Sequence, residues 1–217
     1  MKISKHYRNW AGIIFYAITG QLSAAEETLM LFSDTVLTED FVGHVIIAAD
    51  GITLDCSGYK ISGDGTGNGI EVTGRTDVTI NNCFVSAFSN GIKLEDSSEN
   101  FLGSNQISQN SLGIVLANSS QNYLAANFIQ DNSIGVVVNA SNGNTLVRNH
   151  AVRNAAGFDI LESSDTLLKN NIATENTDTG FFITSSDNTL AVDNQSNGNN
   201  TGFNIEPGST GSYLRGN

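Results

Sequence analysis

The sequence predicts an all-β protein, a parallel β-helix of about seven 22-residue coils with three short strands in each coil. Three observations lead to this prediction. A unit of about 22 residues recurs from Gly69 onward, for example as GIVLANSSQNYLAANFIQDNSI and then GVVVNASNGNTLVRNHAVRNAA. Apolar and polar residues alternate at the start of each unit, which is typical of a strand with one buried face. The connecting segments, such as SSQN and SNGN, favour turns over helices.

Residues 1–24 are predicted to be a secretory signal peptide. The basic segment MKISKHYRNW precedes the apolar stretch AGIIFYAITG, and small residues follow, so cleavage is expected after Ala24 or Ala25. A buried N-terminal helix is the alternative interpretation. The apolar stretch is too short to span a membrane, and nothing later is long enough. We therefore expect a secreted or periplasmic protein with no membrane span in the mature chain.

Residues 25–42 fall outside the regular period, and residues 43–217 contain the repeats. The first segment is predicted to cap the N-terminal end of the helix, because an open solenoid end exposes core side chains and strand edges. Asn217 occupies the position that Asn194 occupies one unit earlier, so the chain is expected to stop in mid-coil. Either the protein continues beyond this sequence, or a partner or self-association covers the C-terminal edge.

Three apolar stripes predict the three strands of each coil. The first strand buries positions 2 and 4 of the unit, which hold Ile70, Ile92, Ile114, Val136, Phe158, Phe181, Phe203 and Val72, Leu94, Leu116, Val138, Ile160, Ile183, Ile205. The second stripe is Ile80, Leu102, Leu124, Leu146, Leu168 and Leu190, and the third is Val85, Ile107, Ile129, Ala151 and Ala173.

Asparagine recurs at two further positions, where it is expected to stack at the corners between strands. These residues are Asn105, Asn127, Asn149, Asn171 and Asn194 at position 15, and Asn110, Asn132, Asn154 and Asn176 at position 20. Side-chain amides stacked ~4.8 Å apart can hydrogen-bond along the stack and satisfy buried polar groups. We interpret these columns as structural rather than ligand-binding.

The motifs GIxL, NxL and N at these spacings, with GITLDCSGYKISG near the start, resemble those of the right-handed parallel β-helix proteins of the pectate-lyase-like superfamily. In particular, residues 43–217 are similar to bacterial periplasmic NosD-like repeat proteins. The resemblance implies a right-handed helix. It does not specify an activity, because the superfamily includes lyases, hydrolases, epimerases and proteins without known chemistry.

Copper binding is the function that a NosD-like resemblance would imply. Outside the expected signal peptide, the soft or imidazole ligands are His44, His150, Met30, Cys56 and Cys83, which are scattered over distant coils. Copper requires two to four such ligands that converge. We therefore predict neither a metal site nor a cofactor.

Cys56 and Cys83 are expected in adjacent coils, with Cα atoms ~4.8 Å apart. A disulfide and a pair of buried thiols are both compatible with this placement. A catalytic cysteine is not expected, because no histidine is positioned to activate either sulfur.

Catalytic members of the superfamily place their site on the outer face of a sheet, where Glu71 and Glu95 are the candidate catalytic pair here. They are expected roughly 8 Å apart, within the range of an inverting glycosidase. Lys93 beside Glu71 would favour ionised carboxylates, whereas a general acid needs a raised pKa. We therefore favour a solvated cross-strand pair. Asp131, Arg153 and Glu175, spaced by one unit, similarly predict a structural column of ion pairs.

Phe101 and Tyr123 are the predicted binding residues, as neighbouring outward aromatic side chains. The formal charge of −12 should repel nucleic acid. We therefore expect a secreted, non-catalytic module that presents an elongated surface to a polysaccharide or an envelope protein. The alternative is a polysaccharide lyase or glycoside hydrolase, present here as a fragment of a longer enzyme.

Overall fold

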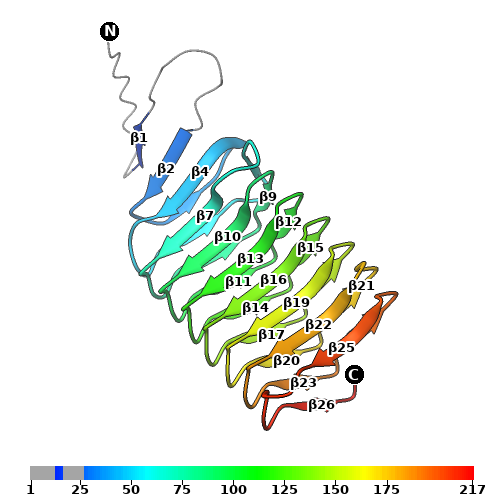
Figure 1. Cartoon of the computed structure of the whole chain (residues 1–217). Helices are drawn as coiled ribbons and strands as arrows, with labels where there is room; N and C mark the ends of the chain where they lie inside the picture. Colours follow the sequence, from blue (N-terminus) through cyan, green and yellow to red (C-terminus); the bar gives the residue numbers. More distant parts are fainter. Residues whose placement is uncertain (1–12, 17–26) are drawn as a thin grey trace.

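The computed structural model describes residues 13–16 and 27–217, and every regular element within them is a β-strand. The strands wind into a stack of coils with three parallel sheets along its length (Figure 1). The predicted parallel β-helix is therefore confirmed. No helix capable of crossing a bilayer occurs in these two ranges.

Sheet A contains the first strand of each coil. Its strands are β2 (Glu27–Leu31), β4 (Phe41–Ile47), β7 (Asn68–Thr73), β10 (Asn90–Glu95), β13 (Leu112–Ala117), β16 (Ile134–Asn139), β19 (Ala156–Leu161), β22 (Thr179–Thr184) and β25 (Thr201–Ile205). These are the longest strands of most coils, and their outer face is the one turned toward the viewer in Figure 1.

Sheets B and C supply the second and third strands. Sheet B contains β3 (Thr35–Val36), β5 (Thr53–Asp55), β8 (Thr79–Asn81), β11 (Phe101–Gly103), β14 (Tyr123–Ala125), β17 (Thr145–Val147), β20 (Leu167–Lys169), β23 (Leu190–Val192) and β26 (Tyr213–Arg215). Sheet C begins with the first residues of β4 and continues through β6 (Lys60–Ser62), β9 (Phe84–Ser86), β12 (Gln106–Ser108), β15 (Phe128–Gln130), β18 (His150–Val152), β21 (Ile172–Thr174) and β24 (Gln195–Asn197).

The register is that expected from the repeat, with each residue opposite the residue one unit away. Ile92, for example, lies between Ile70 and Ile114, and its side chain is fully buried. One residue of the second stripe was predicted wrongly. Leu190 is 39% exposed, and Ala191 takes the buried place opposite Leu168. The unit from Gly157 is one residue longer than its neighbours, so every later inward position moves by one.

The segment predicted as a cap stacks on the repeats as their first turn. β2 runs parallel to β4, with Leu29 opposite Val45, and β3 pairs with β5. The described structure therefore contains about two turns before Gly69. Of the expected signal peptide, only β1 (Ile13–Tyr16) is described, as a strand antiparallel to β2. The remainder of residues 1–24 lies outside the described residues, and cleavage stays a prediction.

The corners are held by buried asparagines bonded from coil to coil. Between sheets B and C, Asn105 Nδ2 donates to Asn127 Oδ1 at 3.0 Å, and Asn127 Nδ2 to Asn149 Oδ1 at 2.8 Å. A residue with positive φ precedes each of these asparagines and turns the chain, as at Ser104 and Ala126. A third column, Asn100, Asn122 and Asn144, lies between sheets A and B and was not identified from the sequence.

Cys56 and Cys83 occupy the start of the corner column between sheets B and C. They are joined by a disulfide, with their Cα atoms 4.7 Å apart and both residues fully buried. The backbone N–H of Cys83 donates to Asn105 Oδ1 at 3.0 Å. The disulfide therefore continues the asparagine column into the N-terminal coils, where this corner has no asparagine pair.

Candidate functional site

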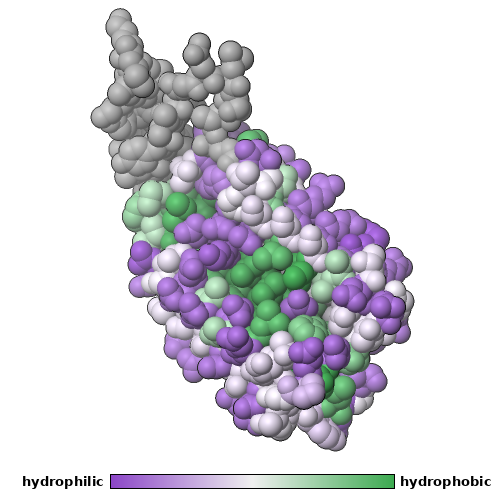
Figure 2. Space-filling view, viewed as in Figure 1, coloured by the Kyte–Doolittle hydropathy of each residue, from purple (hydrophilic) through white to green (hydrophobic). Residues whose placement is uncertain are grey.

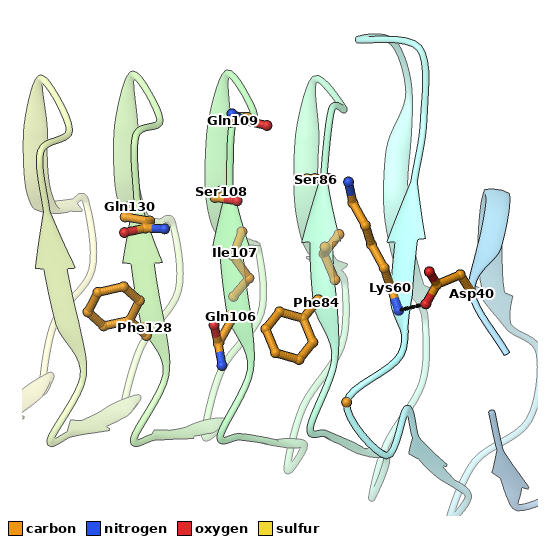
Figure 3. A pocket seen from close by; sticks show the side chains of 12 residues that line it. Asp40, Lys60, Phe84, Ser86, Gln106, Ile107, Ser108, Gln109, Phe128 and Gln130 are labelled. Carbon is orange, nitrogen blue, oxygen red and sulfur yellow. Dashed lines mark hydrogen bonds between the residues drawn. The ribbon is translucent and has the colours of Figure 1, made fainter. Parts of the chain in front are cut away.

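The outer face of sheet C carries a shallow groove of about 350 Å³ over β6, β9, β12 and β15. Its floor is an outward row in strict register: Phe84 lies opposite Gln106, and Gln106 opposite Phe128. Figure 3 looks onto the faces of the two phenyl rings, with the Gln106 side chain between them. Phe84 is 37% exposed. The groove therefore offers two aromatic surfaces separated by one coil.

A second outward row, two residues along each strand, supplies polar groups. It contains Ser86, Ser108 and Gln130, again in register. The Ser86 hydroxyl is buried and, among the described residues, has no hydrogen-bond partner. Because this oxygen is buried beneath the groove surface, the polar side chains that the second row presents to a ligand are those of Ser108 and Gln130.

Side chains from the next coils hold the far end of the groove in place. Arg153 binds both carboxylate oxygens of Asp131 at 2.9 Å and donates to Gln130 Oε1 at 2.8 Å. The amide of Gln130 is thereby fixed, with its NH2 group left to donate. His150 packs edge-on against Phe128, with ring centroids 5.2 Å apart. Burial lowers the pKa of His150, and Glu175 opposes that shift in part, so the imidazole is mainly neutral near pH 7.

The near end of the groove is formed by β6 and the corner before it. Lys60 lies opposite Phe84, and its backbone N–H donates to Asp40 Oδ1 at 2.9 Å (Figure 3). Gly58 has a left-handed φ of 84°, and a Cβ there would lie 3.7 Å from the Phe84 ring. This glycine allows the corner to turn beside the ring without a side chain across it.

The groove corresponds to two outward positions of the repeat unit. The lining residues fill positions 16 and 18 of the unit, on either side of the buried stripe that begins at Val85. Because residues of different chemical type occupy this position in successive units, a search for apolar periodicity does not detect the row. Alignment of the positions on either side of each buried stripe, coil by coil, does reveal it.

The predicted binding residues Phe101 and Tyr123 lie side by side on sheet B. Their rings stack at 5.9 Å with 15° between the planes, and they are 38% and 42% exposed. Each ring therefore covers one face of the other, and neither lines the groove on sheet C.

The Glu71 and Glu95 candidates lie on the outer face of sheet A, but their predicted surroundings were wrong in one respect. Lys93 does lie opposite Glu71, yet its ammonium binds Glu95 on its own strand at 2.9 Å. Glu71 accepts hydrogen bonds from the Asn68 amide at 2.9 Å and the Thr73 hydroxyl at 3.1 Å. The i to i+2 geometry on one strand brings the Lys93 and Glu95 side chains to the same face, which explains the difference.

The middle of sheet A carries an apolar patch on its outer face (Figure 2). Val115 and Val137 are both 8% exposed there, although they point outward. Asp159 lies next in the same column, between Val137 and Phe182. Burial raises the pKa of Asp159 to about 6, with a further contribution from Asp178. Its Oδ1 atom is buried and has no hydrogen-bond partner in the part of the chain that the structure describes. This shift depends on burial, so the sequence alone does not reveal it.

Replacing Asp159 by Asn should stabilise the protein at neutral pH. The pKa of this carboxyl rises from 3.8 in the unfolded chain to about 6 in the folded protein. Its contribution to the free energy of unfolding is therefore fully present below pH 3.8 and is lost as the pH rises through 6. Asp159→Asn removes the loss, on the order of 1–2 kcal/mol after discounting for the solvent that reaches this group. Urea unfolding should show the difference near pH 8 but little of it near pH 4. The exposed Asp96→Asn control should follow the wild type at both values.

The potential metal ligands do not converge. Within residues 27–217 no three His, Cys, Asp or Glu side chains gather as a metal site. His44 lies on sheet A, with Nδ1 2.7 Å from the Asn68 carbonyl oxygen, whereas His150 lies on sheet C. Both cysteine sulfurs are used in the disulfide.

Proteins of known structure share the coiled architecture. The periplasmic alginate epimerase AlgG superposes with a TM-score of 0.64 at 20% identity, over 81% of this chain and 50% of the epimerase. The Dettilon tailspike protein superposes with a TM-score of 0.55 at 15% identity, over 78% of this chain and 47% of the tailspike. An alginate lyase from Paenibacillus sp. str. FPU-7 superposes with a TM-score of 0.52 at 13% identity, over 85% of this chain and 89% of the lyase. Such identities show the fold alone, and this chain spans about half the length of the epimerase.

Sequence comparison identifies the family. No curated protein sequence matches the chain significantly. The family described as periplasmic copper-binding protein (NosD) matches residues 33–217, which is most of the chain. The resemblance drawn from the repeat motifs is thus confirmed, together with the right-handed parallel β-helix that it implies. The chain therefore belongs to the NosD family.

Proposed function

We propose that this protein is an exported β-helix module that binds a polysaccharide chain in the groove of sheet C and does not cleave it. The observation that carries the proposal is the outward row of Phe84, Gln106 and Phe128, beside a second row of polar groups. Apolar faces of sugar rings pack on aromatic rings, while their hydroxyls pair with amides and hydroxyls. A concave site with a few placed polar groups is the usual form of a ligand site.

The groove is favoured over the Phe101 and Tyr123 pair on physical grounds. A sugar packs on the face of an aromatic ring, and the two rings on sheet B each cover a face of the other. In the groove the Gln106 side chain separates the two phenyl rings (Figure 3). Phe84 is thus not stacked on another ring and is 37% exposed, while His150 contacts Phe128 with the two ring planes nearly perpendicular. The family's periplasmic description is consistent with export, and the shared fold of an alginate epimerase and an alginate lyase is consistent with a polysaccharide ligand.

A catalytic role on sheet A is the second candidate. It is favoured by Asp159, an acid with a pKa raised to about 6 in an apolar setting. Asp178, whose charge contributes to that shift, occupies the corner of the one 23-residue unit. A lyase or glycosidase would need a second positioned group, and Glu71 and Glu95 are too far along the sheet to act with Asp159.

Copper binding, which the family description names, is not proposed for this chain. Copper sites use converging imidazole and sulfur ligands. Here the two sulfurs form a disulfide, and His44 and His150 lie on different sheets. The donor set in the described residues therefore does not fit copper.

The binding proposal is tested by affinity electrophoresis of the purified protein in gels that contain soluble neutral or acidic polysaccharides. At least one polysaccharide should retard the wild type, and Phe84→Ala and Phe128→Ala should each weaken binding about tenfold, or ~1.4 kcal/mol. Phe101→Ala is the matched control, because Phe101 and Phe84 have nearly equal exposure, 38% and 37%.

Two results would contradict the proposal. Loss of binding in Phe101→Ala with Phe84→Ala unaffected would move the site to sheet B. New reducing ends or unsaturated products that disappear in Asp159→Asn would replace the binding module by an enzyme.

A further inference from the structure

We infer that the groove of sheet C is specific for a neutral, β-1,4-linked glycan lying along the helix axis with one sugar on each coil. This inference rests on the proposed function, because it names the ligand class of the same site. It depends on the spacing of the aromatic rings, on the charges around the groove and on the free polar groups in it.

The spacing of the two rings selects the linkage. Phe84 and Phe128 lie two coils apart, with Gln106 on the coil between them. Coils repeat every ~4.8 Å, which is about the advance of one sugar in an extended β-1,4-linked chain. Successive sugars in such a chain are turned over relative to one another, so alternate sugars present the same face. An aromatic ring on every second coil therefore meets equivalent faces, with an amide facing the sugar between them.

An α-1,4-linked chain does not fit the same row. Its axial linkages bend the chain into a wide helix, and alternate sugars do not lie on one straight line. The row in the groove is straight, because the parallel register between β9, β12 and β15 is unbroken. Only one ring could then be occupied at a time.

The charges around the groove favour a neutral ligand. Among its described lining residues, Lys60 is the one cation and Asp40 the one anion. Arg153, at the far end, is already engaged by both oxygens of Asp131. The chain as a whole carries a formal charge of −12. A polyanion such as a polyuronate would therefore meet a repulsive field with a single lysine to compensate it.

The polar row supplies partners for sugar hydroxyls. The Ser108 side chain, on the coil between Ser86 and Gln130, is partly exposed to the groove, whereas the Ser86 hydroxyl is buried. Gln130, beside Phe128, keeps its NH2 group as a donor, because Arg153 holds its carbonyl oxygen. The Phe128 end of the row therefore combines one aromatic ring with the Gln130 amide, and the middle coil adds the Ser108 hydroxyl.

The test is isothermal titration of the full chain with matched hexasaccharides: cellohexaose and mannohexaose as neutral β-1,4 chains, maltohexaose as the α-1,4 chain, and hexamannuronate as the anionic β-1,4 chain. One or both neutral β-1,4 hexasaccharides should bind at least tenfold more tightly than the other two. The trisaccharide of the preferred series should bind at least tenfold more tightly than the disaccharide, because three sugars are needed to reach both rings.

Variants separate the ligand class from the site. Phe84→Ala and Phe128→Ala should each reduce the trisaccharide to the affinity of the disaccharide, whereas Phe101→Ala should change nothing. Tighter binding of maltohexaose or hexamannuronate that still depends on Phe84 would overturn the neutral β-1,4 assignment and leave the proposed groove in place. Binding of none of the four, or binding independent of both groove rings, would overturn the assignment and the proposed function together.

Discussion

Asn149→Ala is expected to lower the free energy of unfolding by about 3–5 kcal/mol, at 1–3 kcal/mol for each buried group left unpaired. The Asn149 side chain is 1% exposed and lies in the middle of the column between sheets B and C. Its Oδ1 accepts the backbone N–H and the Nδ2 of Asn127 at 3.1 and 2.8 Å. Its Nδ2 donates to the Leu124 carbonyl at 2.9 Å and to Asn171 Oδ1 at 3.1 Å. Alanine therefore leaves donors and acceptors on both adjacent coils without partners.

Urea unfolding followed by circular dichroism measures this loss. Asn139→Ala is the control, since Asn139 is an exposed residue of the neighbouring sheet A and makes no side-chain bond to the column. It should change the free energy of unfolding by no more than a few tenths of a kcal/mol. A loss below ~1 kcal/mol in Asn149→Ala would mean that water replaces the amide and that the column contributes little.

Removal of the disulfide should have the second largest effect. Cys56 and Cys83 are 27 residues apart, and closing a loop of that length stabilises a fold by ~3.5 kcal/mol in the chain-entropy account. The double variant Cys56→Ala/Cys83→Ala should therefore unfold at a clearly lower urea concentration. The loss should be concentrated in the N-terminal coils, because each coil of a solenoid contacts only its neighbours.

Reduction provides the independent check. Unfolding the wild type in the presence of a thiol reductant should give a midpoint close to that of the double variant. The double variant itself should not respond to the reductant. A wild-type midpoint that is unchanged by reductant would show that the two sulfurs are present as thiols.

The inward-facing side chains could be predicted from the sequence, because each buried position recurs at the length of the repeat unit. The inward stripes and the asparagine column between sheets B and C follow from alignment at a spacing of 22. The proximity of Cys56 to Cys83, which are 27 residues apart, follows from aligning the segments DGITLDC and TDVTINNC. The exception is informative. Leu190 was assigned to the core because the extra residue in the preceding unit was not placed at the corner beside Asp178.

The contacts of the outward-facing side chains could not be predicted in the same way. Outward side chains are not held by core packing, so their partners depend on rotamers as well as on register. The spacing did predict the pair of Arg153 with Asp131 one unit away. Lys93 had an acidic neighbour on each side and binds Glu95, not Glu71. The raised pKa of Asp159 depends on how completely Val137 and Phe182 surround it, which is a property of packing. The groove required both flanking rows of one stripe to be considered together.

The extra residue of the 23-residue unit is absorbed at a corner, and the register on both sides of it is preserved, with Phe158 opposite Phe181 and Phe181 opposite Phe203. The strands on either side of the extra residue, β19 and β22, therefore keep the same length. Duplication or deletion of one complete unit would lengthen or shorten each outer face by a single step without disturbing the others. Duplication of a unit would therefore change the length of each outer face and leave the spacing between coils, and so between the side chains that contact a ligand, unchanged.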